Sequence, residues 1–264
     1  MKHTIKTIFS MKLKKEKITA LTAYDFLTAK FLDESGIDII LVGDSLSNVF
    51  QGNKTTLPVT LDEMIYHAKI VTSAVKNALV IVDMPFLSYQ VSETDAIKNC
   101  GRIMKETNCY GVKLEGGIEI ANIVKKLTSI GIPVMGHLGL TPQSINQFGD
   151  YSLRATEKNE AKKLLSDAKI LETSNCFSIV LEKIPSQLAK KVTASVSIPT
   201  IGIGAGIHCD GQILVTHDIL GMFEEFNLKF VRKYFDGAKV FKEVFSKYKD
   251  DVKKKKFPNE KESF

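Results

Sequence analysis

The chain has 264 residues, of which 44% are hydrophobic and 25% are charged, and 36 Lys and Arg residues against 30 Asp and Glu residues give a formal charge of +6. These values are typical of globular proteins and exclude disordered, collagen-like and coiled-coil classes. The length fits one large domain, and about 250 residues is the usual size of an α/β barrel.

The excess positive charge lies in two runs, at residues 12–17 and 253–256. Runs of like charge near a terminus are usually solvated and loosely ordered, and we expect that for both. Because no recognition motif or aromatic interleaving accompanies them, we expect no nucleic-acid partner.

The four cysteines are too widely spaced for a metal motif and too few for a disulfide framework, so we expect reduced thiols at Cys100, Cys109, Cys176 and Cys209. The first residues lack the apolar stretch of a secretory signal, and no uncharged apolar segment reaches the ~18 residues of a membrane span. We therefore expect a cytoplasmic protein with no membrane partner.

Short apolar runs rich in β-branched residues recur along the chain, and each is followed by polar residues or glycines. Such near-continuous apolar runs are expected for strands of a parallel sheet covered on both faces. In chain order they cover residues 18–23, 37–42, 78–82, 110–115, 133–135, 177–181, 198–201 and 213–215.

Segments with apolar residues at helical spacing separate most of these runs, for example at positions 61, 65, 68 and 71 and at positions 120, 124 and 127. Eight strand–helix alternations predict a (β/α)8 TIM barrel, an α/β fold. We expect a single domain over residues 1–264, with a polar C-terminal extension from about residue 247. An open doubly wound sheet is the alternative, because periodicity alone does not show that a sheet closes.

Ionisable residues stand at or just after the carboxyl ends of five predicted strands. In a parallel barrel these ends open on one face, where the active sites of barrel enzymes lie. Helix capping explains one such residue, but five in succession predict a shared site. The five residues are Asp44, Asp83, Glu115, His137 and Glu182.

Asp44, Asp83 and Glu115 come from neighbouring strands, and their like charges repel unless a cation lies among them. Oxygen ligands favour a hard cation such as Mg²⁺, and no histidine pair or cysteine indicates Zn²⁺. The pattern therefore predicts a magnesium site. The alternative is that each carboxylate caps the next helix and faces solvent.

Lys113 lies two residues before Glu115, so both side chains lie on the same face of the strand. We expect this lysine to hold a substrate carboxylate; a salt bridge with Glu115 or Glu182 and a Schiff base are alternatives. Glu182 in a partly dry pocket is suited to proton transfer, with an ion pair to Lys183 or Lys113 as the alternative. Two glycines flank His137 and let a ligand approach the backbone.

Residues 202–206 are Gly-Ile-Gly-Ala-Gly, which resembles the glycine loops that bind phosphates after the last strands of barrels. The spacing is not a dinucleotide-binding fingerprint, and no Lys-Ser/Thr pair follows. Glycines that simply keep the barrel mouth open are the alternative.

Several motifs are distributed over most of the chain. The longest is His-Leu-Gly-Leu-Thr-Pro-Gln-Ser at 137–144. The others are Gly-Asp-Ser at 43–45, Thr-Leu-Pro-Val-Thr at 56–60, Asp-Met-Pro-Phe at 83–86, Val-Lys-Leu-Glu-Gly-Gly at 112–117, the glycine loop at 202–206, Asp-Gly-Gln-Ile-Leu-Val at 210–215 and His-Asp at 217–218. Together they resemble the ketopantoate hydroxymethyltransferase family over about residues 19–241.

The resemblance implies transfer of a hydroxymethyl group from 5,10-methylenetetrahydrofolate to 3-methyl-2-oxobutanoate, giving 2-dehydropantoate for pantothenate biosynthesis through a Mg²⁺-stabilised enolate. It implies that Asp44 and Asp83 ligate Mg²⁺, with Glu115 as a further or water-mediated ligand, and that Glu182 accepts the proton. It also implies a homodecamer. The implied substrate-binding residues are Asp44, Ser45, Asp83, Lys113 and His137.

The chain departs from the family pattern at two places. Residues 152–156 are Ser-Leu-Arg-Ala-Thr where the family usually has Lys-Val-Gln-Gly-Arg, and residues 261–264 are Lys-Glu-Ser-Phe where it commonly has Glu-His-Ser-Phe. Neither change affects the expected metal or base positions.

Two other functions fit parts of the pattern. One is another Mg²⁺-dependent oxo-acid carbon–carbon lyase or synthase of the pyruvate/phosphoenolpyruvate barrel type, which would act without folate. The other is a non-catalytic binding protein whose basic tails contact nucleic acid, and salt-dependent DNA binding that survives Asp83→Ala would indicate it.

Overall fold

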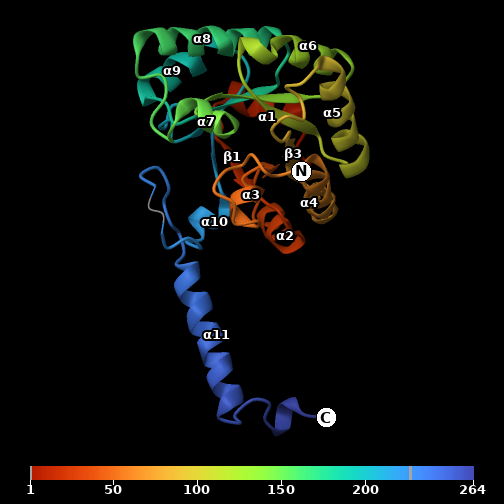
Figure 1. The fold of residues 1–264 in the computed structure, drawn as a ribbon, viewed down its shortest axis with the longest axis vertical. Helices are drawn as coiled ribbons and strands as arrows, with labels where there is room; N and C mark the ends of the chain where they lie inside the picture. Colours follow the sequence, from red (N-terminus) through yellow and green to blue (C-terminus); the bar gives the residue numbers. More distant parts are fainter. Residues whose placement is uncertain (1, 226–227) are drawn as a thin grey trace. The chain divides into compact units, whose positions relative to one another are not determined.

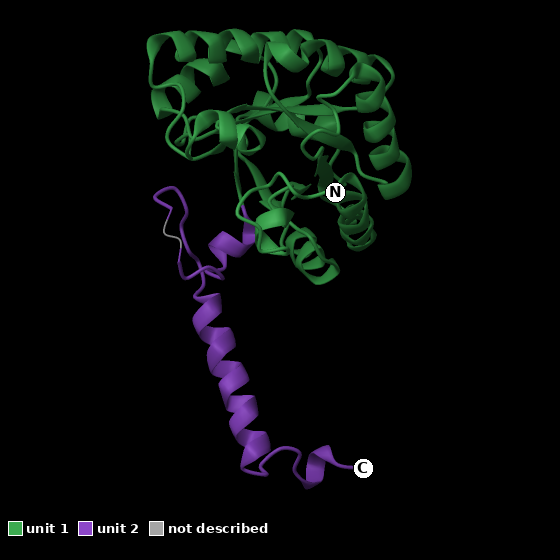
Figure 2. Cartoon of the chain, in the orientation of Figure 1, with its two compact units in different colours: residues 1–214 green, residues 215–264 purple. Residues whose placement is uncertain are grey.

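The computed structural model describes residues 2–225 and 228–264, and the chain forms two compact units, Met1–Leu214 and Val215–Phe264 (Figure 2). The first unit contains every strand of the sheet. The single-domain organisation stays a prediction; Lys247, near the expected start of the polar extension, lies within a long helix of the second unit.

Eight parallel strands form a closed barrel in which each strand pairs with its neighbour in sequence. The first and last strands also pair, with Ile18 opposite Gly211, and this closes the ring. The predicted TIM barrel is therefore confirmed and the open sheet is excluded. Each strand overlaps one predicted apolar run: β1 (Ile18–Thr22), β2 (Ile39–Val42), β3 (Leu79–Asp83), β4 (Gly111–Glu115), β5 (Val134–Gly139), β6 (Ser178–Glu182), β7 (Thr200–Ile203) and β8 (Gly211–Leu214).

Helices surround the barrel (Figure 1), and both segments predicted from helical spacing are helical. The first of them is capped by Thr60, whose side chain forms a capping box with that of Glu63. None of the helices in the described ranges is long and apolar enough to cross a membrane. The helices of the first unit are α1 (Ile5–Lys14), α2 (Phe26–Glu34), α3 (Leu46–Val49), α4 (Leu61–Ala74), α5 (Glu93–Thr107), α6 (Ala121–Ser129), α7 (Ile145–Phe148), α8 (Lys158–Thr173) and α9 (Ser186–Ser195).

Side chains alternate between the barrel interior and the layer under the helices, as the two-residue period of a strand requires. In β2, Ile39 and Leu41 belong to the interior cluster, whereas Ile40 and Val42 belong to the larger cluster that packs against the helices. Ile8 of α1 is fully buried within the interior cluster, so α1 contributes to that core. This alternation determines which strand residues reach the mouth of the barrel.

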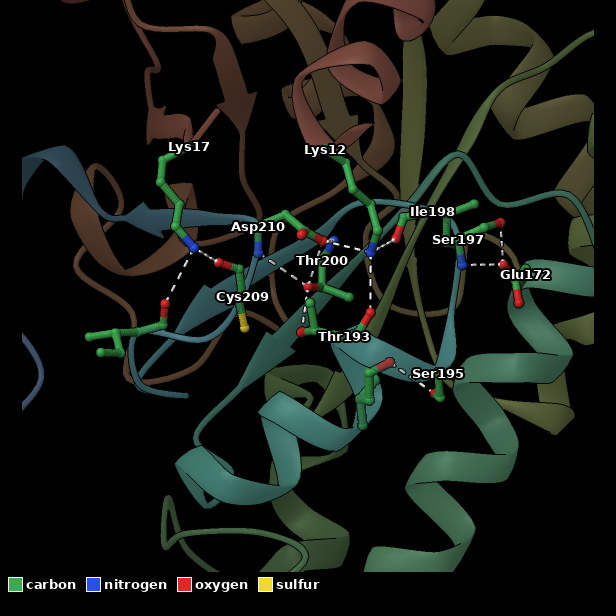
Figure 3. Close-up of polar contacts among 12 residues, drawn as sticks. Lys12, Lys17, Glu172, Thr193, Ser195, Ser197, Ile198, Thr200, Cys209 and Asp210 are labelled. Atoms are coloured by element: carbon green, nitrogen blue, oxygen red, sulfur yellow. Dashed lines mark hydrogen bonds and ion pairs between the residues drawn. The ribbon is translucent and has the colours of Figure 1, made fainter. Parts of the chain in front are cut away.

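Lys12, at the end of α1, is bound to the amino end of the barrel (Figure 3). Its Nζ donates hydrogen bonds to Thr193 O, Ile198 O and Asp210 Oδ2 at 3.2, 2.9 and 2.9 Å. Asp210 Oδ2 also accepts hydrogen bonds from the backbone N–H and hydroxyl of Thr200. The expectation of a loosely ordered run at 12–17 is therefore wrong for Lys12, because the barrel end supplies three acceptors for its ammonium.

The second unit contains α10 (Thr216–Ile219) and α11 (Gly237–Lys253). Phe241, Phe245 and Tyr248 recur at helical spacing on α11 and are 44–66% exposed. Residues 253–256 are exposed, as predicted for the second basic run. All four cysteines are free and buried.

Candidate active site

Three of the predicted site residues continue the inward-facing rows of β3, β5 and β6. Ile81, Met135 and Val180 belong to the interior cluster, and the residues two positions later are Asp83, His137 and Glu182. The period of two therefore directs all three toward the interior at the carboxyl ends of the strands. Strand register places Asp83 opposite Lys113, Glu115 opposite His137, and Gly139 opposite Glu182.

The structure brings the three predicted metal ligands together in the mouth of the barrel. Asp44, Asp83 and Glu115 are buried, with 4%, 2% and 7% exposure. The Asp44 N–H donates to Asp83 Oδ2 at 3.0 Å. Gln143 bridges Asp44 and Glu115. Its side-chain amide donates to Asp44 Oδ2 at 2.9 Å, and its backbone N–H donates to Glu115 Oε2 at 3.0 Å. The alternative of solvent-facing helix caps is therefore excluded.

These carboxylates strongly affect one another. Burial, followed by the charges of Asp83 and Glu115, raises the pKa of Asp44 to about 8. Burial also raises the pKa of Asp83, although Lys113 opposes this shift. Burial by itself would also raise the pKa of Glu115. His137, Lys113 and the Gln143 N–H outweigh it, and the pKa of Glu115 is lowered.

Lys113 pairs with Asp83, with 2.7 Å between Nζ and Oδ1. This partner differs from Glu115 and Glu182, the partners considered in the sequence analysis. Burial disfavours the charged ammonium, but Asp83, Glu115 and Asp44 outweigh it and raise the pKa of Lys113. The amine is therefore charged and is not a nucleophile, which disfavours a Schiff base.

His137 lies between two carboxylates, with Nδ1 3.3 Å from Glu115 Oε1 and Nε2 3.3 Å from Glu182 Oε2. Burial and Lys113 lower its pKa, but Glu115 and Glu182 outweigh them and raise it to about 9. The histidine thus connects the acidic cluster to Glu182, whose side chain is 15% exposed.

Ser45 is held by a tyrosine that the sequence analysis did not identify. The hydroxyls of Tyr24 and Ser45 lie 2.6 Å apart, and Tyr24 is fully buried. Burial raises the pKa of Tyr24, so its hydroxyl stays protonated. A Cβ on Gly43 would lie 2.8 Å from Ser45 Oγ, which explains why the residue before Asp44 lacks a side chain.

Two further buried residues, Tyr89 and Gln143, belong to the site and were missed as functional residues. The Tyr89 hydroxyl accepts a hydrogen bond from the Glu115 N–H at 3.1 Å and lies 2.9 Å from Gln143 Oε1. Gln143 lies inside the motif at 137–144, and this motif was the feature of the sequence that could have identified it as a site residue. No periodicity or strand end marked Tyr89.

The glycine loop has a packing role that the sequence did not reveal. Gly206 has φ of +80°, and a Cβ there would lie 2.1 Å from Ser186 Oγ at the start of α9. This close approach requires glycine. Phosphate binding by the loop stays a prediction.

The altered segment at 152–156 lies beside β6. The Arg154 N–H donates to Lys183 O at 2.8 Å, next to Glu182, and its guanidinium lies 4.1 Å from the centre of the Phe148 ring. Arg154 also pairs with Glu160 of α8. The segment is thus connected to the mouth of the barrel.

The site has donor atoms and charge to accommodate a divalent cation. Asp83 Oδ1 and Glu115 Oε1 are buried, and each faces one basic group, Lys113 Nζ at 2.7 Å and His137 Nδ1 at 3.3 Å. Four carboxyl groups face two basic groups, Lys113 and His137, which leaves two negative charges in excess when all are ionised. In the described part of the chain, no three His, Cys, Asp or Glu side chains are placed to hold a metal ion together.

Solved structures share this fold at low sequence identity. A phosphonopyruvate hydrolase, solved with oxalate and Mg²⁺, aligns with a TM-score of 0.67 and 10% identity over 98% of this chain and 93% of its own. A phosphoenolpyruvate phosphomutase from Streptomyces platensis subsp. rosaceus aligns with a TM-score of 0.64 and 11% identity over 96% and 88%. The first unit therefore belongs to the same class of barrel fold as these two proteins.

Sequence comparison defines the family within this class. The pattern of the ketopantoate hydroxymethyltransferase family matches residues 2–260, and this chain belongs to that family. The 3-methyl-2-oxobutanoate hydroxymethyltransferases of Chlorobaculum parvum and Prosthecochloris aestuarii are 57% and 55% identical to it, covering 99% of this chain and 96% of theirs. The enzyme of that name from Christiangramia forsetii is 55% identical with the same coverage.

Proposed function

We infer that the chain transfers a hydroxymethyl group from 5,10-methylenetetrahydrofolate to 3-methyl-2-oxobutanoate, producing 2-dehydropantoate in pantothenate biosynthesis. The observation that carries this inference is the full-length similarity to enzymes named for this reaction. The buried cluster of acids, lysine and histidine supports it, because acid–base chemistry on an oxo acid needs such groups.

Asp44 and Asp83 are the proposed ligands of a Mg²⁺ ion, with Glu115 as a further or water-mediated ligand. The excess negative charge and the burial of these carboxylates support this assignment. Mg²⁺ keeps several waters and usually uses only one or two carboxylates together with substrate oxygens, so a closed group of three protein ligands is not required. When bound, Mg²⁺ supplies Lewis-acid polarisation of an oxo group.

The oxo acid is held by the charged and hydroxyl groups around this cluster. Lys113, positively charged beside Asp83, provides a partner for the substrate carboxylate. Ser45, fixed by Tyr24, provides a hydroxyl, and His137 lies beside the same space. Asp44 and Asp83 complete the proposed substrate-binding set.

Glu182 is the proposed proton acceptor. Its contact with the His137 ring holds one carboxylate oxygen in place on the opposite side of His137 from Glu115. Glu182 removes the proton from C3 of the oxo acid, and C3 then bonds to the one-carbon unit of the folate. Water supplies the hydroxyl group of the product, and the bond between the one-carbon unit and the folate nitrogen breaks to release tetrahydrofolate.

Turnover of 3-methyl-2-oxobutanoate with and without methylenetetrahydrofolate tests the proposal. Folate-dependent formation of 2-dehydropantoate is expected. Breakdown of an oxo acid without folate would instead indicate a carbon–carbon lyase, the alternative considered from the sequence.

The expected homodecamer and cytoplasmic location stay predictions. The exposed apolar side chains of α11, including Phe241, Phe245 and Tyr248, support self-association, because apolar surface of this kind commonly marks an interaction site. Light scattering on the purified chain measures the number of subunits.

A further inference from the structure

Gln143 connects the carboxyl ends of several strands of the barrel. It lies in the short 3-10 turn Pro142–Ser144 that follows β5, and it is 6% exposed. Its side-chain amide donates to Asp44 Oδ2 at 2.9 Å and to Met84 O at 2.8 Å. Its backbone N–H donates to Glu115 Oε2 at 3.0 Å. One residue therefore contacts the segments at the ends of β2, β3 and β4.

The orientation of the Gln143 amide is determined by its partners. Oε1 accepts hydrogen bonds from the Tyr89 hydroxyl at 2.9 Å and from Gln90 Nε2 at 3.0 Å. Both lone pairs of the oxygen and both protons of the nitrogen are therefore engaged. A flipped amide would place Oε1 against the Asp44 carboxylate and Nε2 against the Gln90 amide nitrogen, so the donor must face Asp44.

We propose that Gln143 is a positioning residue that holds the carboxylates of Asp44 and Glu115 in place for the cation and oxo acid, and that Tyr89 fixes its orientation. This inference rests on the proposed function. Two buried like charges tend to separate or to rotate away from each other. The neutral amide, together with its own backbone N–H, gives each carboxylate a donor and restrains one oxygen of each.

Partners of this kind around a metal site typically change metal affinity by about 10–100-fold when they are removed. We therefore expect Gln143→Met, which conserves length and volume, to weaken Mn²⁺ binding to the substrate-free full-length protein by about 10–100-fold. Tyr89→Phe removes the hydroxyl that donates to Gln143 Oε1 and accepts from the Glu115 N–H, and because Gln90 still donates to Oε1 we expect a smaller loss of about 3–10-fold.

Electron paramagnetic resonance of Mn²⁺ measures this binding without turnover. Gln187→Met is the matched control, because Gln187 is exposed on α9. A second readout is the Mg²⁺ dependence of activity: excess Mg²⁺ should restore most of kcat in Gln143→Met, which it would not do for a distorted fold. If Gln143→Met does not fold, Tyr89→Phe decides by the same two measurements.

Mn²⁺ binding within twofold of the wild type in both variants, or a kcat that excess Mg²⁺ does not restore, overturns the positioning role. Wild-type protein with folate-dependent transfer but no Mn²⁺ binding also overturns it and leaves the proposed function intact. Wild-type protein that binds Mn²⁺ but shows no folate-dependent transfer overturns the proposed function instead.

Discussion

Lysine–aspartate pairs lie at both ends of the barrel, and their surroundings differ. At the amino end, Lys12 and Asp210 are 2.9 Å apart, and each of the three ammonium protons has a protein acceptor (Figure 3). At the mouth, Lys113 and Asp83 are 2.7 Å apart, and the surrounding groups are mainly further carboxylates. The nitrogen–oxygen distances of the two pairs are similar. The pairs differ in the net charge of the groups around them and in the number of hydrogen bonds to the lysine.

From this difference we expect the Lys12–Asp210 pair to be structural and the Lys113–Asp83 pair to be functional. A buried polar group whose partners are all protein atoms stabilises the fold and has no capacity left for a ligand. The mouth instead places four carboxyl groups against two basic groups, so negative charge remains in excess when all of them are ionised. This agrees with the general rule that the carboxyl face of such barrels carries the chemistry and the amino face carries stability.

The largest effect is expected for Asp83→Ala, which removes a proposed metal ligand. Lewis-acid stabilisation amounts to several kcal/mol, so Mg²⁺-dependent turnover should fall by about 10³-fold or more. Stability should change little, because the lost pair with Lys113 is offset by relief of repulsion from Asp44 and Glu115. Turnover assays measure the loss of activity and thermal unfolding measures the change in stability. Asp62→Ala, at an exposed position, is the control. Unfolding of Asp83→Ala would show that the mouth, too, is mainly structural.

Asp44→Ala, which removes the other proposed metal ligand, should also lose Mg²⁺-dependent turnover without unfolding.

Glu182→Gln should reduce kcat by about 10²-fold or more, because a positioned base contributes this much. Binding of 3-methyl-2-oxobutanoate should remain nearly unchanged, since Lys113 and Ser45 are untouched. Steady-state kinetics and calorimetric binding of the oxo acid separate the two quantities. Loss of binding with kcat retained would mean that Glu182 holds substrate and does not accept the proton.

At the amino end, Lys12→Met should lower the free energy of unfolding by about 2–3 kcal/mol, because it leaves the Asp210 carboxylate and two carbonyls without their cation. The kcat of the folded protein should stay within about twofold, since the mouth is unaffected. Urea unfolding provides the measurement, and Lys14→Met, at an exposed position of α1, provides the control. A large loss of kcat without destabilisation would contradict the division between the two ends.

The smallest effect is expected at Asp33, which caps the segment before β3. Its carboxylate accepts hydrogen bonds from the N–H groups of Lys76, Asn77 and Ala78. Burial alone would raise the pKa of Asp33, but these donors and the Asn77 side chain lower it below its ordinary value. Asp33→Asn should therefore cost about 1–2 kcal/mol near neutral pH.

The sign of the pH dependence at Asp33 follows from its lowered pKa. The contribution of the charged form is present above the unfolded-state pKa of about 3.9 and is lost as the pH falls through the lower folded-state value. The difference in the free energy of unfolding between wild type and Asp33→Asn should be constant from about pH 5 to about pH 8 and should decrease below about pH 4. Urea unfolding across this range measures it; a difference that grows in acid would contradict the assignment.

Much of the site could be predicted because strand ends and inward-facing positions follow from local sequence. Asp83, Glu115, His137 and Glu182 were identified at strand ends, and the barrel brings them together. Lys12 was misjudged because charge runs are usually solvated, and its acceptors lie more than 180 residues away in sequence.

By itself the sequence determined the eight strands, the residues that would stand at their carboxyl ends and, through its motifs, the family. These features depend on local periodicity and residue type, which can be read directly along the chain. Three features are visible only in three dimensions: the sheet closes, Lys113 pairs with Asp83, and Gln143 and Tyr89 contact the acidic cluster. Such partners are set by how strands and loops distant in sequence meet in space, and no local pattern specifies them.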